Sequence, residues 1–247
     1  MGLDLDGAGA VVTGAASGLG AATVDALLAR GARVLALDRA PVTPRRALTA
    51  LELDVADGDA VADALAGWEA APLRLAVACA GIAPAAKLVG RDGAHDPATF
   101  RRAVEVNLVG TFHLLRSAAS RMAALPPLAD GARGVVVTTA SIAAEEGQAA
   151  QCAYAASKGG VAAMTLPAAR ELARHGIRVV AIAPGVFDTP MMAEMPAAVR
   201  EGLEATTPFP KRMGVPAEFA QLVLHCADNA YLNGAVLRLD GGLRMGS

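Results

Sequence analysis

A glycine-rich turn between an apolar segment and a helical pattern constrains the fold of this chain most strongly. Residues Ala8–Thr13 form a short apolar run, the segment TGAASGLG begins at Thr13, and a helical pattern covers about Leu19–Arg30. Glycines in such a turn permit a tight bend, the approach of backbone N–H groups to a pyrophosphate, and close packing of helix on strand. A glycine turn without a ligand is the alternative. Because this turn follows a strand and opens a helix, the pattern favours a dinucleotide-binding loop with Gly14, Gly18 and Gly20.

Strand and helix patterns alternate along the remaining sequence. Further strands are expected at Arg33–Leu37, Leu51–Val55, Leu73–Ala78, Gly134–Thr139, Ile177–Ala183 and Ala235–Leu239, and further helices at Asp57–Gly67, Ala98–Ala124, Gln151–His175 and Pro216–Asp228. Apolar residues make up 54% of the chain and aromatic residues only 3%, so the core is expected to consist of Ala, Val and Leu, which suit helices packed on a parallel sheet. The sequence predicts an α/β fold, a Rossmann-type doubly wound parallel sheet of seven strands with helices on both faces, in one domain over residues 1–247.

Charge and cysteine content argue against several functional classes. The net charge of −2, without a basic stripe, offers no surface for nucleic acid. Cys79, Cys152 and Cys226 fit neither a disulfide framework nor a zinc site, so we expect no metal and a reducing compartment. The N-terminus lacks a secretory pattern, and no apolar run reaches the roughly 18 residues of a membrane span. A soluble, cytoplasmic protein without a membrane partner is therefore expected.

Tyr154 and Lys158 are the strongest candidates for catalytic chemistry. They are four residues apart on a predicted helix, so their side chains lie on one face. An ammonium beside a phenol favours the phenolate, and we therefore expect the pKa of Tyr154 to fall from about 10 towards neutral pH. Such a phenol can take a proton from an alcohol or return it to a carbonyl. The chain has only three lysines, which makes Lys158 unusual, although the spacing is also typical of an ordinary surface pair.

Two carboxylates follow predicted strands. Asp38 ends the second strand, where a carboxylate can accept hydrogen bonds from the adenosine ribose and repel a 2′-phosphate, which favours NAD over NADP. Arg39 could instead receive that phosphate, and Asp38 could be a turn residue. Asp54 closes the third strand, and we expect it either to lie beside the adenine or to cap the helix Asp57–Gly67.

Small or polar residues mark three further positions. The segment Cys79-Ala80-Gly81 follows the fourth strand and would let the backbone approach a ligand, with Cys79 expected to serve packing rather than reactivity. Ser141, just beyond the fifth strand, could hydrogen-bond a carbonyl oxygen or turn the chain. Asn107 lies in an apolar helical stretch, so it is either a hydrogen-bonded core amide or a site residue.

Two connections are expected to meet the substrate. The polar connection Ile82–Pro97 is long and follows a strand, and its Lys87 and Arg91 could contact an anionic group or be solvated loop cations. Residues 186–212 are rich in proline and methionine and are expected to form a mobile segment that covers the substrate.

These residues, in this order, resemble the short-chain dehydrogenase/reductase family across the whole chain. The residues that carry the resemblance are Thr13–Gly20, Asn107, Ser141, Tyr154, Lys158 and Pro184-Gly185. Further segments are most similar to the type II 3-hydroxyacyl-CoA dehydrogenases of that family, among them Thr139-Ala140-Ser141, Glu146-Gly147-Gln148 and Pro208-Phe209-Pro210. The family often has Asn-Asn-Ala-Gly where this chain has Ala78-Cys79-Ala80-Gly81, and the loop Pro84–Asp96 also differs from the type II enzymes.

The resemblance implies a role for each candidate residue. Tyr154 is the general acid/base and Lys158 lowers its pKa and binds the nicotinamide ribose, while Ser141 positions the substrate oxygen and Asn107 holds a water. The residues implied to hold NAD are Gly14, Ser17, Gly18, Leu19, Gly20, Asp38, Asp54, Val55, Cys79, Ala80, Gly81, Tyr154, Lys158, Pro184, Gly185, Phe187 and Thr189. The residues expected to contact substrate are Ser141, Gln148, Gln151 and Tyr154.

The implied activity is the NAD-dependent interconversion of a secondary alcohol and a ketone in a homotetramer. The favoured substrate is a 3-hydroxyacyl-CoA thioester, as in fatty acid metabolism, and the alternatives are a steroid, a sugar alcohol or a 3-ketoacyl carrier protein. A non-catalytic NAD-binding scaffold has no need for the set Ser141, Tyr154 and Lys158, so the sequence favours an enzyme.

Overall fold

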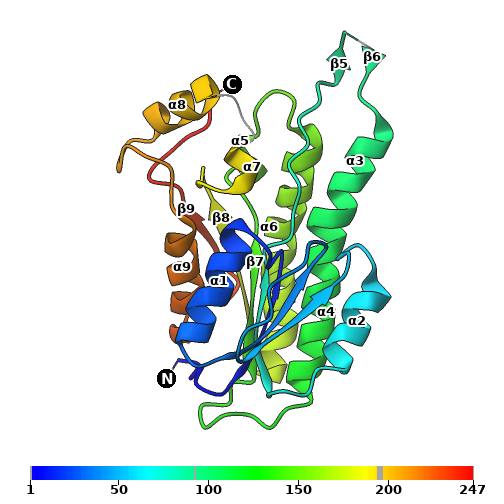
Figure 1. The fold of residues 1–247 in the computed structure, drawn as a ribbon, viewed down its shortest axis with the longest axis vertical. Coiled ribbons are helices and arrows are strands. Elements are labelled where there is room, and N and C mark those ends of the chain that lie inside the picture. Colours follow the sequence, from blue (N-terminus) through cyan, green and yellow to red (C-terminus); the bar gives the residue numbers. More distant parts are fainter. Residues whose placement is uncertain (1, 92, 194–196, 247) are drawn as a thin grey trace.

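A parallel sheet of seven strands forms the centre of the computed structural model, which describes residues 2–91, 93–193 and 197–246 (Figure 1). The strands lie in the order β3-β2-β1-β4-β7-β8-β9. Their bounds are Gly9–Thr13 (β1), Arg33–Asp38 (β2), Leu48–Glu52 (β3), Leu73–Ala78 (β4), Gly134–Thr139 (β7), Ile177–Pro184 (β8) and Val236–Leu239 (β9). The chain adds β2 and β3 on one side of β1 and then crosses to the other side, and such a reversal opens a crevice at the carboxyl ends of β1 and β4. The predicted fold class is confirmed.

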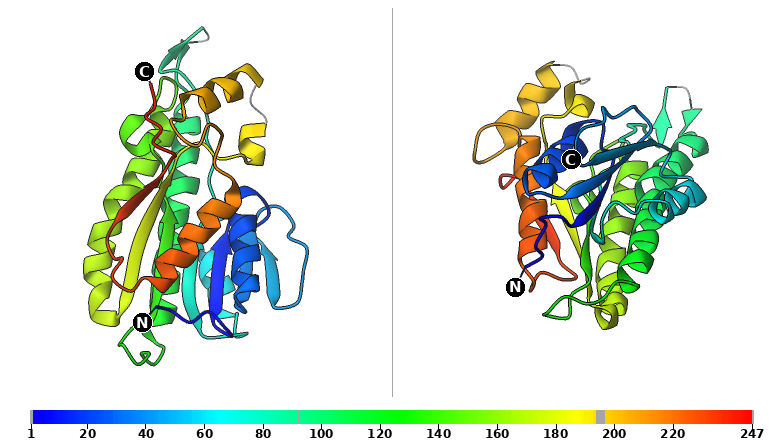
Figure 2. Two further views of the ribbon diagram at one scale, coloured as in Figure 1. Left: turned by 90° about the vertical axis from the view of Figure 1, so that its left-hand side faces the viewer. Right: turned by 60° about the horizontal axis from the view of Figure 1, so that its bottom comes forward.

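Successive residues of each strand point to opposite faces of the sheet, and both faces are covered by helices. Val12 of β1 packs with one cluster that includes Leu27 and Phe219, whereas Val11 packs with another that includes Leu114 and Met122. Accordingly α1 (Gly18–Ala29) and α9 (Pro216–Asp228) cover one face, and α2 (Gly58–Ala66), α4 (Gly110–Ala123) and α6 (Cys152–Leu172) cover the other (Figures 1 and 2).

One predicted strand is misplaced along the chain. The expected strand Leu51–Val55 is wrong, because β3 covers Leu48–Glu52 and pairs in register from Val34 opposite Leu48 to Asp38 opposite Glu52. Leu53 and Val55 of the predicted strand lie beyond β3 but still pack against or within the core, so apolar character alone did not mark the end of the strand. Asp54 therefore follows the strand instead of closing it.

The long helical pattern Ala98–Ala124 contains a change of helix type. It begins as α3 (Pro97–Val104), passes through a π-helical turn at Glu105–Val109 and continues as α4. Asn107 lies in that turn, and single π turns within α-helices are frequent at functional sites.

Several short elements were not expected from the sequence. The connection Ile82–Pro97 carries a small hairpin of β5 (Val89–Gly90) and β6 (Gly93–Ala94), which Figure 1 shows projecting beyond α3. Helix α5 (Ala143–Glu146) follows β7, and α7 (Pro190–Ala193) and α8 (Ala197–Thr206) occupy much of the expected covering segment 186–212. Met195 and Pro196 of that segment lie outside the described residues, and its mobility stays a prediction.

The helices that the structure describes include none with the length and apolar character needed to cross a membrane.

Replacing Phe219 by Ala should destabilise the fold strongly. Its side chain is fully buried and meets the ring of Phe187 edge-on, with 6.5 Å between centroids. Loss of a buried aromatic ring leaves a cavity, which should lower the free energy of unfolding by about 3–5 kcal/mol, measured by urea denaturation. Tyr231→Ala is the matched control, since this aromatic ring is 99% exposed and its loss should change stability by about 0.5 kcal/mol or less. Equal effects of the two substitutions would contradict the assigned core.

Candidate active site

A cavity of about 740 Å³ lies at the carboxyl ends of the strands, where the sheet topology opens a crevice. The residues predicted for the cofactor and the substrate line this cavity together: Gly14, Ser17, Gly18, Leu19, Gly20, Asp38, Asp54, Val55, Cys79, Ala80, Gly81, Ser141, Gln148, Gln151, Tyr154, Lys158, Pro184, Gly185, Phe187 and Thr189. Asn107 is the predicted site residue that lies behind the wall. The fold thus brings segments from almost the whole chain to one place.

The turn after β1 leaves the start of α1 facing the cavity. Ser17 is the N-cap residue of α1, yet among the described residues its side chain accepts no hydrogen bond from the first turn, so the backbone N–H groups there are free to bind an anion. A Cβ on Gly14 would lie 2.6 Å from the backbone nitrogen of Ala80, and a Cβ on Gly20 would overlap the carbonyl oxygen of Gly14. The turn therefore requires its glycines and fits the pyrophosphate of a dinucleotide.

Asp38 joins the glycine turn to the end of β2. Its Oδ2 accepts a hydrogen bond from the Ala16 N–H at 2.9 Å, and its Oδ1 accepts one from the Ala40 N–H at 2.9 Å. Each carboxylate oxygen keeps a second acceptor position, so the side chain can still accept hydrogen bonds from ribose hydroxyls in the cavity. Asp38 is both a turn residue and a possible ribose ligand.

Asp54 forms ion pairs and does not cap a helix. The expectation that it could cap α2 is wrong, because Asp57 is the N-cap and accepts from the N–H groups of Asp59 and Ala60. Burial tends to raise the pKa of Asp54, but the Ala56 N–H and the guanidinium groups of Arg102 and Arg39 outweigh this and lower it. Its Oδ2 lies 2.6 Å from Arg102 Nη2 and 3.8 Å from Arg39 Nε. Arg39 thus already has a carboxylate partner.

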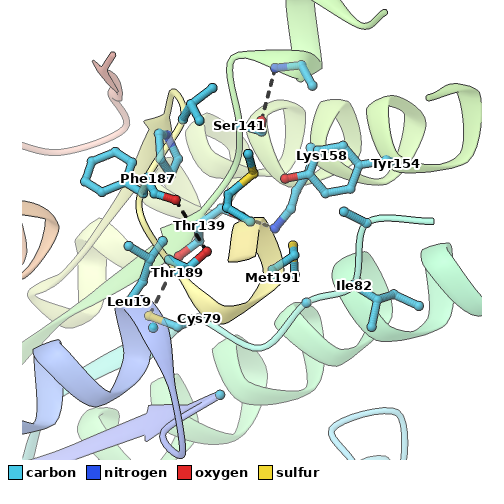
Figure 3. A pocket seen from close by; sticks show the side chains of 18 of the residues that line it. Leu19, Cys79, Ile82, Thr139, Ser141, Tyr154, Lys158, Phe187, Thr189 and Met191 are labelled. Carbon is cyan, nitrogen blue, oxygen red and sulfur yellow. Dashed lines mark hydrogen bonds between the residues drawn. The ribbon is translucent and has the colours of Figure 1, made fainter. Parts of the chain in front are cut away.

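Tyr154, Ser141 and Lys158 meet on one side of the cavity. Figure 3 shows the Tyr154 hydroxyl directed between the other two side chains. Burial raises the pKa of Tyr154, and a hydrogen bond with Ser141 opposes this only in part. The Lys158 ammonium lies 5.9 Å from the centre of the Tyr154 ring and donates instead to the Thr139 carbonyl oxygen at 2.7 Å. The expected fall in the pKa of Tyr154 is therefore wrong for this structure, because burial raises this pKa and only the hydrogen bond with Ser141 opposes the rise.

Lys158 is one of the few buried charged side chains of the described residues. It is 4% exposed, and burial lowers its pKa to about 8. A group with this pKa is still mostly protonated at neutral pH. The cavity therefore holds a positive charge next to Tyr154.

Asn107 links the loop after β4 to α6. Its side-chain amide donates to the Ile82 carbonyl oxygen at 2.8 Å and to Ser157 Oγ at 2.9 Å, and its Oδ1 accepts from the Ile82 N–H at 2.8 Å. Ser157 in turn donates to the carbonyl oxygen of Tyr154 at 2.7 Å. Asn107 is thus a fully hydrogen-bonded core amide that holds the backbone near Tyr154, and its binding of a water stays a prediction.

The three cysteines have different surroundings. Burial raises the pKa of Cys79, which lines the cavity, to about 12, and that of Cys226 to about 11. Cys152 is exposed at the start of α6. Because a neutral thiol is a poor nucleophile, the expectation that Cys79 serves packing agrees with its environment.

Gln148 and Gln151 border the part of the cavity beyond Ser141. The Gln148 N–H donates to Gln151 Oε1 at 3.0 Å, and Ser141 Oγ accepts from the Ala143 N–H at 3.1 Å, so the serine also turns the chain. The connection Ile82–Pro97 contributes Ile82 and Ala83 to the wall. Neither Lys87 nor Arg91 is among the described residues that line the cavity.

Two further groups of residues line the cavity. Met191 and Met192 of α7 and Leu203 and Thr206 of α8 belong to the predicted covering segment 186–212, whereas sequence reasoning missed the C-terminal segment Leu243–Gly246 as part of the wall. The methionines were a visible signal, since they mark the covering segment, but nothing in the local sequence places the C-terminal segment beside Gln148.

Comparisons with known proteins agree with this arrangement. Residues 8–200 match the family model of the short chain dehydrogenases. The chain is 44% identical to the 3-hydroxyacyl-CoA dehydrogenase type-2 of Bos taurus, with 96% of this chain and 95% of that one covered, and 36% identical to the (3R)-3-hydroxyacyl-CoA dehydrogenase of Rattus norvegicus, with 98% of both covered. The crystal structure of 3-hydroxyacyl-CoA dehydrogenase type-2 from Mycobacterium avium superposes with a TM-score of 0.92 at 40% identity, covering 97% of each chain.

The stability of the protein should depend on pH through Lys158. Its pKa is about 8 in the folded protein against an ordinary value of 10.5, so between these values the unfolded chain binds more protons and stability rises with pH. Relative to the non-titrating variant Lys158→Met, the wild type should gain up to about 3 kcal/mol from pH 7 to above pH 10. Urea denaturation of both proteins at several pH values measures this. A difference between them that stays constant with pH would contradict the depressed pKa.

Proposed function

The chain belongs to the short-chain dehydrogenase family, and we propose that it is an NAD-dependent oxidoreductase that interconverts 3-hydroxyacyl-CoA and 3-ketoacyl-CoA thioesters. The observation that carries the proposal is that Ser141, Tyr154 and Lys158 share one cavity with a glycine turn suited to a dinucleotide. A scaffold that only binds nucleotide has no use for a buried lysine beside a phenol.

The proposed chemistry follows from the protonation of these side chains. A nicotinamide, when bound, supplies or accepts the hydride at the carbinol carbon. The Ser141 hydroxyl holds the substrate oxygen, and the Tyr154 hydroxyl gives that oxygen its proton in reduction and removes it in oxidation. Burial keeps Tyr154 protonated at neutral pH, which suits donation to a carbonyl. The Lys158 ammonium stabilises the phenolate that remains after donation.

The preference for NAD over NADP is proposed from the carboxylates at the adenine end. Asp38 would accept hydrogen bonds from the ribose hydroxyls and repel a 2′-phosphate. Arg39, the cation that could bind such a phosphate, lies beside Asp54. Both features support NAD.

The thioester substrate is proposed from the relatives, whose names include 3-hydroxyacyl-CoA dehydrogenase type-2 and (3R)-3-hydroxyacyl-CoA dehydrogenase. Apolar residues of α7, α8 and the C-terminal segment, such as Met191, Leu203 and Leu243, are suited to an acyl chain.

A homotetramer is also proposed. Helices α3, α4 and α6 expose the apolar side chains of Phe100, Phe112 and Leu166, which are 40%, 50% and 44% exposed. Apolar groups of this size on neighbouring helices suit a contact between subunits. The cytoplasmic location stays a prediction from the sequence.

The decisive assay is NADH oxidation by the purified protein with acetoacetyl-CoA, beside NADPH and beside a free ketone. Fast turnover that requires both NADH and the CoA thioester supports the proposal. Binding of NADH without turnover of the thioester would leave the family assignment intact and reject the proposed substrate.

Replacing Tyr154 by Phe should remove the proton donor and little else. We expect kcat to fall by about 100- to 10,000-fold, the contribution of a general acid, while the Kd for NADH, measured by fluorescence titration, changes by no more than about twofold. A Tyr154→Phe enzyme that keeps substantial activity would show that another group transfers the proton.

Replacing Asp38 by Asn should weaken the discrimination against NADP. The amide oxygen can still accept from the Ala16 N–H but the amide nitrogen cannot accept from the Ala40 N–H, so the variant removes the charge and keeps one of the two hydrogen bonds of the turn. The ratio of kcat/KM for NADH to that for NADPH should fall by about tenfold or more, because the repulsion of a 2′-phosphate is lost. An unchanged ratio would remove Asp38 from this role.

A further inference from the structure

The C-terminal segment Leu243–Gly246 forms part of the wall at the substrate end of the cavity. It follows β9, which Figure 1 shows rising to the same end of the molecule as α5 and α8. Leu243 is 2% exposed, so the segment is packed into the protein at its start. The Gln148 side chain donates to the Gly246 carbonyl oxygen at 3.3 Å, which brings the segment beside a residue predicted to contact substrate.

One carboxylate at the end of α5 holds this segment. Glu146 Oε2 accepts from the Met245 N–H at 3.0 Å, and Glu146 Oε1 lies 3.0 Å from Arg238 Nη1 and 3.4 Å from Arg244 Nε. These three partners all belong to β9 or to the residues after it. The Met245 N–H and the Arg238 guanidinium lower the pKa of Glu146, with a smaller effect of Arg244, so the carboxylate stays charged at neutral pH.

A second carboxylate completes the network within the C-terminal part itself. Asp240 Oδ2 lies 2.8 Å from Arg238 Nε and 3.1 Å from Arg244 Nη1, and the Asp240 side chain is 9% exposed. Arg238 also donates to the Leu243 carbonyl oxygen at 3.2 Å. Arg238 thus joins Glu146, Asp240 and the start of the segment, and such networks order a chain more firmly than an isolated surface pair.

Glu146 is also close in sequence to Ser141, the residue proposed to hold the substrate oxygen. It ends α5, the short helix that begins two residues after Ser141, and α5 packs on α6, which carries Tyr154. A shift of Glu146 or of its partners would therefore change the distance between the C-terminal wall and the position of the substrate oxygen.

We propose that Glu146 is a positioning residue that holds Leu243–Gly246 as the end wall of the substrate site and thereby sets the acyl chain length that the enzyme accepts. The chain-length part rests on the proposed function. Leu243 and Met245 would face the end of the acyl chain. Release of the segment from Glu146 would make room for longer acyl chains, and shorter acyl chains would then make fewer contacts with the wall.

The test compares Glu146→Ala and Glu146→Gln with the wild type. The alanine variant loses all three partners, whereas the glutamine variant can still accept from the Met245 N–H but no longer pairs with the arginines. Asp25→Asn is the control, because it removes one carboxylate of a more exposed ion pair, 2.7 Å from Arg45, whose two side chains do not line the cavity. Should the Glu146 variants fail to fold, Arg244→Ala weakens the same network from the other side.

Hydrogen exchange of the C-terminal peptide measures the holding of the segment without any substrate. The amides of residues 243–246 should exchange at least about fivefold faster in Glu146→Ala than in the wild type, with Glu146→Gln between them and Asp25→Asn unchanged. Equal exchange in all variants would overturn the positioning role, whatever the substrate of the enzyme is.

Steady-state kinetics with four-carbon and ten-carbon 3-ketoacyl-CoA thioesters tests whether Glu146 sets the acyl chain length. In Glu146→Ala the ratio of kcat/KM for the four-carbon to the ten-carbon thioester should fall by about tenfold, mainly through a higher KM for the short substrate. An unchanged ratio despite faster exchange would overturn the role in chain length. Absence of thioester turnover by the wild type would instead reject the proposed function, and the chain-length role with it, while the exchange experiment still decides whether Glu146 holds the segment.

Discussion

The buried ammonium of Lys158 is the interaction on which the site depends. Removing a cation from water is costly, and the fold compensates only in part, with one short hydrogen bond to the Thr139 carbonyl oxygen. The lowered pKa of Lys158 reflects the part of the desolvation cost that this hydrogen bond does not offset. The large aliphatic core on both faces of the sheet offsets this cost, and the protein thereby keeps a positive charge at the end of β7, beside the phenol that needs it.

The site around this charge is assembled from backbone as much as from side chains. The Asn107 amide fixes the loop after β4 to Ser157, and Asp38 fixes the glycine turn to the end of β2. In both cases a polar side chain satisfies backbone groups that the ends of parallel strands leave free. The side chains that shape the cavity are therefore also the ones that satisfy free backbone groups. Asn107 does this from a π-helical turn, a local irregularity that is frequent at functional sites.

The sequence predicted the elements whose signal is local and missed what tertiary contacts decide. The strands β4 and β7 and the helix α9 have the expected bounds, because buried parallel strands are continuous apolar runs and α9 starts with a proline. The edge strand β3 was displaced, since apolar character continues beyond its end at Leu53 and Val55. The pKa of Tyr154 was predicted in the wrong direction, because sequence shows the neighbouring lysine but not the degree of burial. The C-terminal part of the cavity wall depends on contacts between residues about 90 positions apart, such as that of Glu146 with Arg238, which no local pattern reveals.

The unequal surroundings of the three thiols make the protein convenient for spectroscopy. With pKa values near 12 and 11, Cys79 and Cys226 are almost entirely protonated at neutral pH, whereas Cys152 is exposed. A maleimide dye would therefore react first at Cys152, which is two residues before Tyr154 on the same helix. A fluorophore attached there would report events in the cavity from just outside it, in the natural sequence and without an engineered attachment point.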